Sequence, residues 1–104
     1  MIQVKINDTL YPASVEGKII DTNWDNRSSK SITLVMDYYT AIALFVDGMV
    51  WSIVVDHEDG TAEYDNSDYC VAGPITDNRD GTMTVKMGKL TELEEAYEIL
   101  LGGI

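Results

Sequence analysis

The hexapeptides DHEDGT at residues 56–61 and DNRDGT at residues 77–82 constrain the fold of this chain more than any other feature. A calcium loop of the EF type needs ligands on alternate residues and a glycine at the sixth place, whereas DNRDGT has acids three residues apart and a glycine at the fifth. Aspartate followed by glycine suits a hairpin loop that ends in a residue with positive φ, and the threonine can resume a strand. The repeat therefore predicts two tight hairpin turns of the same design without bound metal, with Gly60 and Gly81 at positive φ.

Strand-like segments lie on both sides of these turns. Residues 1–6 alternate apolar and polar side chains, and an Asn-Asp pair leads from them into residues 10–15, which predicts a hairpin. Pro12 cannot donate a ladder hydrogen bond, so the second strand is expected at an edge or with a bulge, and Gly17 is expected to reverse the chain. Further strand segments are expected at residues 18–21, 31–36, 49–55, 62–64, 69–72, 75–77 and 82–87, with a loop at residues 22–30.

A helical period replaces this alternation at residues 38–47, where apolar side chains fall on one side. Asp37 can cap the N-terminus of this segment, and Gly48 supplies a C-terminal stop. We therefore expect a short helix here.

A second helix is expected at residues 91–101. Thr91 and Glu94 have the spacing of a capping box, in which each side chain bonds the backbone N–H of the other residue. Two glycines end the segment. The apolar residues expected to bury this helix against the sheet are Leu93, Tyr97 and Leu100, with Glu92, Glu95 and Glu98 left in water.

These elements fit one α+β domain that spans residues 1–104. A chain of 104 residues suits a single core, and 45% hydrophobic residues supply enough apolar surface to offset chain entropy. We expect a mostly antiparallel sheet that can curl into a partial barrel or sandwich, with the two short helices, at about 38–47 and 91–101, packed against it.

Acidic residues dominate the charge of the chain. Eighteen Asp and Glu against seven Lys and Arg give a net charge of −11, and residues 31–78 contain nine acids and no Lys or Arg. Such a surface repels nucleic-acid phosphates and anionic lipids, which argues against direct nucleic-acid binding. The stretch is interpreted either as a solvated acidic surface or as a DNA mimic that inhibits a host nucleic-acid-binding protein.

The sequence offers no recognisable set of catalytic, cofactor-binding or metal-ligating residues. Its single cysteine, Cys70, cannot form an internal disulfide, and with the single histidine, His57, it cannot build a zinc site. We expect His57 in an exposed turn and Cys70 as a small buried residue in a strand. No nucleotide-binding glycine loop, nucleophile elbow or Cys-x-x-Cys motif occurs, so we expect no enzyme, no cofactor and no small-molecule substrate.

The segment DTNWDN at residues 21–26 comes nearest to a metal-binding pattern. Asp21, Asn23 and Asp25 alternate as in a calcium loop. The sixth place holds asparagine rather than glycine, and the twelfth holds isoleucine where a bidentate glutamate belongs. We expect a surface loop anchored by Trp24 instead, without metal.

Targeting and membrane signals are not recognisable. No continuous apolar stretch follows Lys5 in the N-terminal residues, and nowhere do about 18 apolar residues run together. We therefore expect no secretory signal and no membrane span. The expected location is cytoplasmic.

Phrases along nearly the whole chain carry a family resemblance, among them INDTLYPASVEGKI, LFVDGMVWSIV, EYDNSDYCVAGPITDNRDGT and VKMGKLTELEEAYEILLGG. On these phrases the chain resembles small uncharacterised proteins encoded in prophages of Gram-positive gut bacteria. The resemblance implies a context of phage morphogenesis or phage–host interference, and it transfers no site residue.

Together with the missing catalytic motifs, this resemblance favours a non-enzymatic structural or assembly protein that acts through protein–protein contacts. The expected partners are proteins, a second copy of the chain among them. An unblunted strand edge at residues 31–36 is the expected means of self-association.

Overall fold

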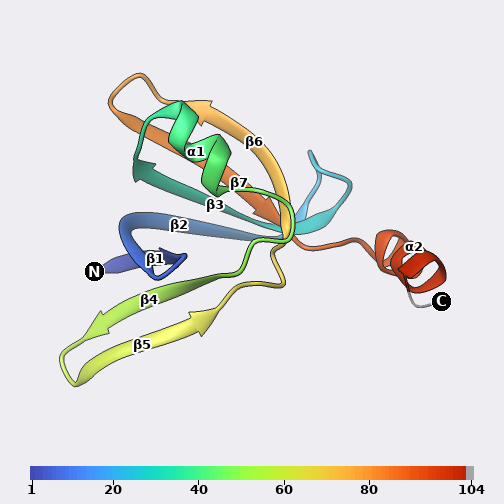
Figure 1. Ribbon diagram of the computed structural model, residues 1–104, viewed down its shortest axis with the longest axis horizontal. Coiled ribbons are helices and arrows are strands. Elements are labelled where there is room, and N and C mark those ends of the chain that lie inside the picture. The colour runs from blue at the N-terminus through green and yellow to red at the C-terminus, as the bar shows by residue number, and fades with distance from the viewer. Residues whose placement is uncertain (103–104) are drawn as a thin grey trace.

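The structure, a computed structural model, describes residues 1–102 and forms, within them, an α+β fold with one seven-stranded sheet and two helices (Figure 1). The elements are β1 (Ile2–Ile6), β2 (Thr9–Asp21), β3 (Arg27–Val35), α1 (Tyr38–Leu44), β4 (Trp51–His57), β5 (Gly60–Asp65), β6 (Val71–Asp77), β7 (Thr82–Gly88) and α2 (Glu92–Gly102). The strand order β5-β4-β1-β2-β3-β7-β6 places the meander β1-β2-β3 between two hairpins, and every pairing is antiparallel. The expected fold class is confirmed, and the sheet is not closed into a barrel.

β2 belongs to both halves of the sheet. It pairs with β1 as far as Pro12, which lies opposite Gln3, and from Ala13 onward it pairs with β3. Pro12 therefore lies where the strand changes partners, a place that tolerates its missing N–H. Gly17 lies inside the strand opposite Lys30, so the expected reversal at this glycine is wrong. The pairing with β3 continues on both sides of Gly17, with Glu16 opposite Ser31 and Lys18 opposite Ser29, so the antiparallel ladder holds this glycine in an extended strand.

β3 is a central strand, bonded to β2 on one side and to β7 on the other. The expected loop at residues 22–30 shrinks to residues 22–26, and the edge expected at residues 31–36 is not free, because this segment is paired on both sides. The polar residues of this segment suggested a loop. Arg27 and Ser29 are nevertheless buried in the strand, where their side chains have hydrogen-bond partners.

The two hexapeptides form hairpins, as predicted. Gly60 has φ 132° and Gly81 has φ 90°, so the prediction of positive φ is confirmed at both. The loops differ in design, however, because two residues separate β4 from β5 and four separate β6 from β7. In the second loop, aspartate side chains accept hydrogen bonds from backbone N–H groups and stabilise the longer turn.

β6 is one edge strand rather than the two segments expected around Gly73-Pro74. The pairing with β7 shifts register between Ala72 and Ile75, so the proline lies in a bulge. An edge strand tolerates proline because one side of its backbone needs no partner.

The sheet is strongly curved, as the connection between its two edge strands requires. Six strand spacings of about 4.8 Å would separate β5 from β6 by about 29 Å in a flat sheet. The chain has only six residue steps from Asp65 to Val71, which reach about 22 Å at most. Trp51 Nε1 donates to Tyr69 O at 3.0 Å and holds this connection across the curl.

The core lies inside the curl, and α1 packs against β6 and β7 beside it (Figure 1). Asp37 caps α1 as expected, with Oδ1 accepting from Thr40 N at 2.8 Å, and Gly48 has φ 78°. The helix ends at Leu44, earlier than expected, because Phe45 leaves helical geometry and is buried in the core. The buried apolar side chains are Val4, Ile6, Ile32, Leu34, Met36, Ala41, Phe45, Met49, Trp51, Val54, Met83, Val85 and Met87.

In residues 1–102, no helix has the length and apolar character that a bilayer span needs.

Candidate functional site

α2 begins with the capping box that its sequence predicts. Thr91 Oγ1 accepts a hydrogen bond from Glu94 N at 3.2 Å, and Glu94 Oε1 accepts one from Thr91 N at 2.8 Å. Two backbone N–H groups that lack helical partners are satisfied in this way. The local sequence therefore fixes where the helix starts.

Arg27 ties this first turn to the sheet. Its Nη1 and Nη2 donate to the two carboxylate oxygens of Glu94 at 2.7 and 3.1 Å, and Nη1 also donates to Lys89 O at 3.0 Å. A forked pair of this kind is among the strongest side-chain interactions. The same hydrogen bonds lower the pKa of the Glu94 carboxyl and raise the pKa of Arg27. Figure 1 shows α2 beyond the end of the sheet, joined to β7 by a short connection.

Trp24 packs against Arg27 and positions it. The guanidinium carbon lies 4.7 Å from the ring centroid, a cation–π distance. A Cβ at Gly73 would lie 2.7 Å from the Trp24 ring, and one at Gly88 would lie 2.8 Å from it. Two glycines, one in β6 and one in β7, therefore make room for Trp24, which anchors its loop as expected. We call Arg27, Trp24, Gly73 and Gly88 the Arg27 seat.

Asp21 is buried at the end of β2 and paired with Lys86. Its Oδ2 accepts from Lys86 Nζ at 2.7 Å and from Ser29 Oγ at 2.8 Å, and its Oδ1 accepts from Asn23 N at 3.1 Å. These hydrogen bonds, that from Lys86 above all, lower the pKa of Asp21 to about 2. Asp21 is therefore a structural carboxylate that stays ionised at neutral pH.

The calcium-like spacing at residues 21–25 does not bring its ligands together. Asp21 is buried against Lys86, whereas Asp25 is exposed and lies 3.5 Å from Arg27. Within residues 1–102 no group of three or more His, Cys, Asp or Glu side chains could hold a metal ion.

α2 exposes the side chains that were expected to bury it. Leu93, Tyr97 and Leu100 are 73%, 61% and 65% exposed, so the prediction that they pack against the sheet is wrong. The reason lies in the connection, because β7 ends at Gly88 and the following residues carry the helix past the end of the sheet (Figure 1). An amphipathic helix is thus held at its first turn and leaves its apolar side chains in water.

The acids of residues 31–78 are mostly engaged within the protein. Seven of the nine accept a hydrogen bond or form an ion pair, often with a backbone N–H group in a turn or cap. Glu58 and Asp59, at the tip of the β4-β5 hairpin, make no such contact with the described residues. The engaged acids are Asp37, Asp47, Asp56, Glu63, Asp65, Asp68 and Asp77. The acidic pattern therefore largely reflects contacts within the protein, among them turn and cap hydrogen bonds at Asp37, Asp65 and Asp77.

His57 and Cys70 do not join a site. His57 is the last residue of β4 and is exposed beside the hairpin loop, close to the expectation. Cys70 precedes β6 and is only partly buried, so its expected place as a buried strand residue is wrong. Its carbonyl accepts from Gly48 N at 2.8 Å, which fixes it in the connection between the sheet edges.

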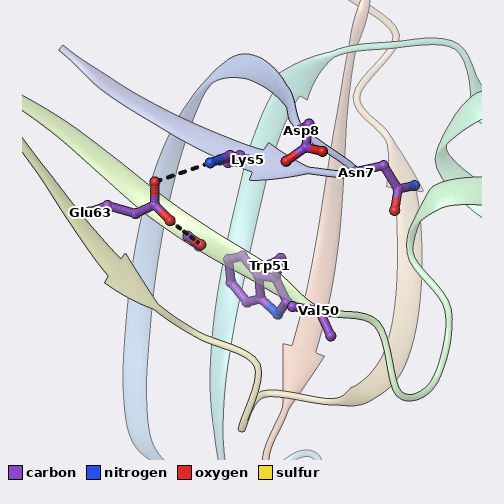
Figure 2. Close-up of a pocket in the computed structure, with 7 residues that line it drawn as sticks. Lys5, Asn7, Asp8, Val50, Trp51 and Glu63 are labelled. Carbon is purple, nitrogen blue, oxygen red and sulfur yellow. Dashed lines mark hydrogen bonds and ion pairs between the residues drawn. The ribbon is translucent and has the colours of Figure 1, made fainter.

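A pocket of about 270 Å³ opens beside β1 and β4 (Figure 2). Glu63 bonds two of its neighbours there, accepting from Lys5 Nζ at 3.4 Å and from Ser52 Oγ at 3.1 Å. Lys5 and Glu63 thus pair with each other, whereas Asp8, which also lines the pocket, forms no ion pair with the described residues. This arrangement does not point to a particular ligand.

The Arg27 seat was not predicted from the sequence. Glycine inside a strand often marks a close approach of another group, and Gly73 and Gly88 carried that signal. Which aromatic side chain fills the space depends on the fold, because Trp24 lies far from both glycines in the chain.

Comparison of the chain with protein-family models, with curated proteins and with solved structures finds no match.

Proposed function

We propose that the chain is a non-enzymatic structural or assembly protein of phage origin that acts through protein–protein contacts. The observation that carries the proposal is the exposure of the apolar side chains of α2. A helix of 11 residues is marginal in water without packing partners, and an exposed apolar stripe commonly marks an interaction site. A bound protein would both stabilise the helix and cover the stripe.

The use of the carboxylates supports a role without catalysis. Acid–base chemistry needs carboxylates that can reach a substrate in a defined geometry. Asp56 instead accepts from Thr61 Oγ1 at 3.4 Å, and Asp65 accepts from Ser67 N at 3.0 Å. These groups stabilise the β4-β5 hairpin and the turn after it.

The sheet edges support α2 as the docking element. β6 is interrupted by the bulge at Pro74, and β5 has only six residues and carries Glu63 and Asp65. Proline, bulges, short length and charge are features that prevent edge-to-edge pairing. We therefore assign the contact to the helix rather than to a strand edge.

The alternative function, an acidic DNA mimic, has weaker support. A mimic needs rows of free carboxylates, whereas most acids of residues 31–78 have partners within the protein. This alternative predicts salt-sensitive binding to a DNA-binding protein in competition with duplex DNA. We expect no such competition.

Co-expression with the products of the neighbouring genes tests the proposed function. We expect the chain to co-purify with one of them in fixed stoichiometry, and its gene to lie among genes for head or tail proteins. A chain that purifies alone from every combination, or that retains a cofactor or turns over a substrate, contradicts the proposal.

A further inference from the structure

The apolar side chains of α2 form one stripe. Leu93, Tyr97 and Leu100 recur at intervals of four and three residues, which places them on one side of the helix, and all three are largely exposed. Leu101 lies between the stripe and the side of the helix that carries Glu94, whereas Ile99 lies roughly a third of a turn from the stripe on the other side. This spacing is typical of helices that bind by inserting an apolar face into a groove.

The tie to Arg27 leaves the stripe accessible. Successive helical residues are turned by roughly 100°, so Glu94, which faces Arg27, points roughly a quarter of a turn away from Leu93. The Arg27 seat therefore holds the helix by one side and presents the stripe on another. A helix held in this way loses less orientational freedom when it docks.

Acidic side chains flank the stripe. The α2 segment ELEEAYEILLG contains four glutamates and no basic residue. Glu98 and Glu92 are exposed and lie roughly a third of a turn from the stripe, one on each side, and Glu95 lies behind it. A surface complementary to this helix has an apolar groove with basic side chains at its rim.

A second copy of the chain does not offer such a surface. Its net charge is −11, and in the described part of the chain only Lys18 and Arg79 among seven basic residues lack an ion pair or a hydrogen bond to a side chain. The basic residues with partners are Lys5, Arg27, Lys30, Lys86 and Lys89. Docking between two copies would bring like charges together, and an anionic lipid surface would repel the helix as well.

We infer that α2 docks as a helix into an apolar groove, rimmed by Lys and Arg side chains, on a second and different protein. Leu93, Tyr97 and Leu100 are the anchors, and Glu92 and Glu98 meet the basic rim. This inference rests on the proposed function and adds the contacting element and the chemistry of the partner.

The test measures the affinity of the full chain for the purified partner from the co-expression experiment. Leu100→Ser removes an anchor, and Ile99→Ser is the matched control because Ile99 is about as apolar and as exposed but lies roughly a third of a turn from the stripe. We expect Leu100→Ser to weaken binding about tenfold or more and Ile99→Ser to change it little. Binding should also weaken as salt rises from about 0.05 M to about 0.5 M, and less steeply in the double variant Glu92→Gln/Glu98→Gln.

Each other outcome overturns the inference in a distinguishable way. A partner that binds Leu100→Ser as tightly as the wild type, or binds independently of salt, refutes the docking mode and leaves the proposed function standing. A dimer in sedimentation that Leu100→Ser abolishes identifies a second copy as the occupant. Binding to phosphatidylcholine vesicles that Leu100→Ser abolishes identifies a membrane surface. No partner at all refutes this inference together with the proposed function.

Discussion

Arg27 and Glu94 lie 67 residues apart in the chain and form a forked ion pair, with nitrogen–oxygen distances of 2.7 and 3.1 Å. The Arg27 side chain is 3% exposed, whereas that of Glu94 is 40% exposed. Because the guanidinium has left water, removing Glu94 leaves a buried charge with only the Lys89 carbonyl, the more distant Asp25 and the Trp24 ring to compensate it. The position of α2 and the stability of the sheet end therefore depend on the same contact.

Replacing Glu94 should destabilise the protein, whereas replacing its neighbour should not. We expect Glu94→Gln to lower the free energy of unfolding by about 1–3 kcal/mol, because a charged hydrogen-bonded partner of Arg27 is lost. Glu95→Gln is the control, since Glu95 is exposed on the same helix. Urea denaturation measures both, and equal stability of the two variants would contradict the role of the pair.

Trp24 fills the space beside Gly73, so a larger residue at this position should destabilise the protein. Gly73→Ala puts a Cβ 2.7 Å from the Trp24 ring and 2.9 Å from Lys86 O, so we expect a loss of roughly 1–3 kcal/mol. In Gly17→Ala the nearest atom, Lys30 Cγ, is 4.0 Å away, so this variant should keep wild-type stability. Thermal unfolding compares them, and tolerance of Gly73→Ala would show that the ring can move aside.

The free energy of unfolding should decrease as the pH is lowered through the range where Asp21 titrates. The folded protein lowers the pKa of Asp21 from 3.8 to about 2, so the unfolded state takes up the proton first. The stabilisation by ionised Asp21 is complete above about pH 5 and is lost as the pH falls toward about 2. Asp21→Asn should flatten this part of the stability profile, and Asp59→Asn is a control at an acid that makes no hydrogen bond or ion pair with the described residues. Hydrogen bonds also lower the pKa values of Asp37 and Asp65, so some acid sensitivity will remain.

Two leucines with opposite exposure should respond differently to the same substitution. Leu34 is 3% exposed in the core and Leu100 is 65% exposed on α2. We expect Leu34→Ala to cost about 2–5 kcal/mol and Leu100→Ala about 0.5 kcal/mol or less. Chemical denaturation decides the matter, since a large loss in Leu100→Ala would mean that the helix packs on the sheet in solution.

Local chemistry was sufficient to predict the two Asp-Gly hairpins, the helix N-caps and the fold class, although it wrongly placed a reversal of the chain at Gly17. Aspartate followed by glycine predicted both hairpins, and Thr91 with Glu94 predicted the start of α2. These features depend on residues within a few positions of each other, so the sequence carries them directly.

Features that depend on distant partners could not be read from the sequence. Arg27 and Ser29 look like loop residues until Glu94 and Asp21 are placed beside them. The apolar spacing of α2 was correctly interpreted as a helix, but the same stripe suits a sheet of this chain or a groove on another protein. Only the path of the chain after β7 shows that the stripe does not pack on the sheet of this chain.

The strand order also determines when this protein can fold. Four strand pairings join neighbours across short loops, whereas β1 with β4 and β3 with β7 join distant segments, such as Ile2 opposite Val55 and Ser29 opposite Gly88. Contacts so distant in sequence slow folding, because a long loop must close before they form. During synthesis the meander β1-β2-β3 leaves the ribosome with both outer strands unpaired, and its partners arrive only with the second half of the chain. A nascent chain stalled before β7 would expose β3 as a template for aggregation, so rapid completion of translation protects this protein.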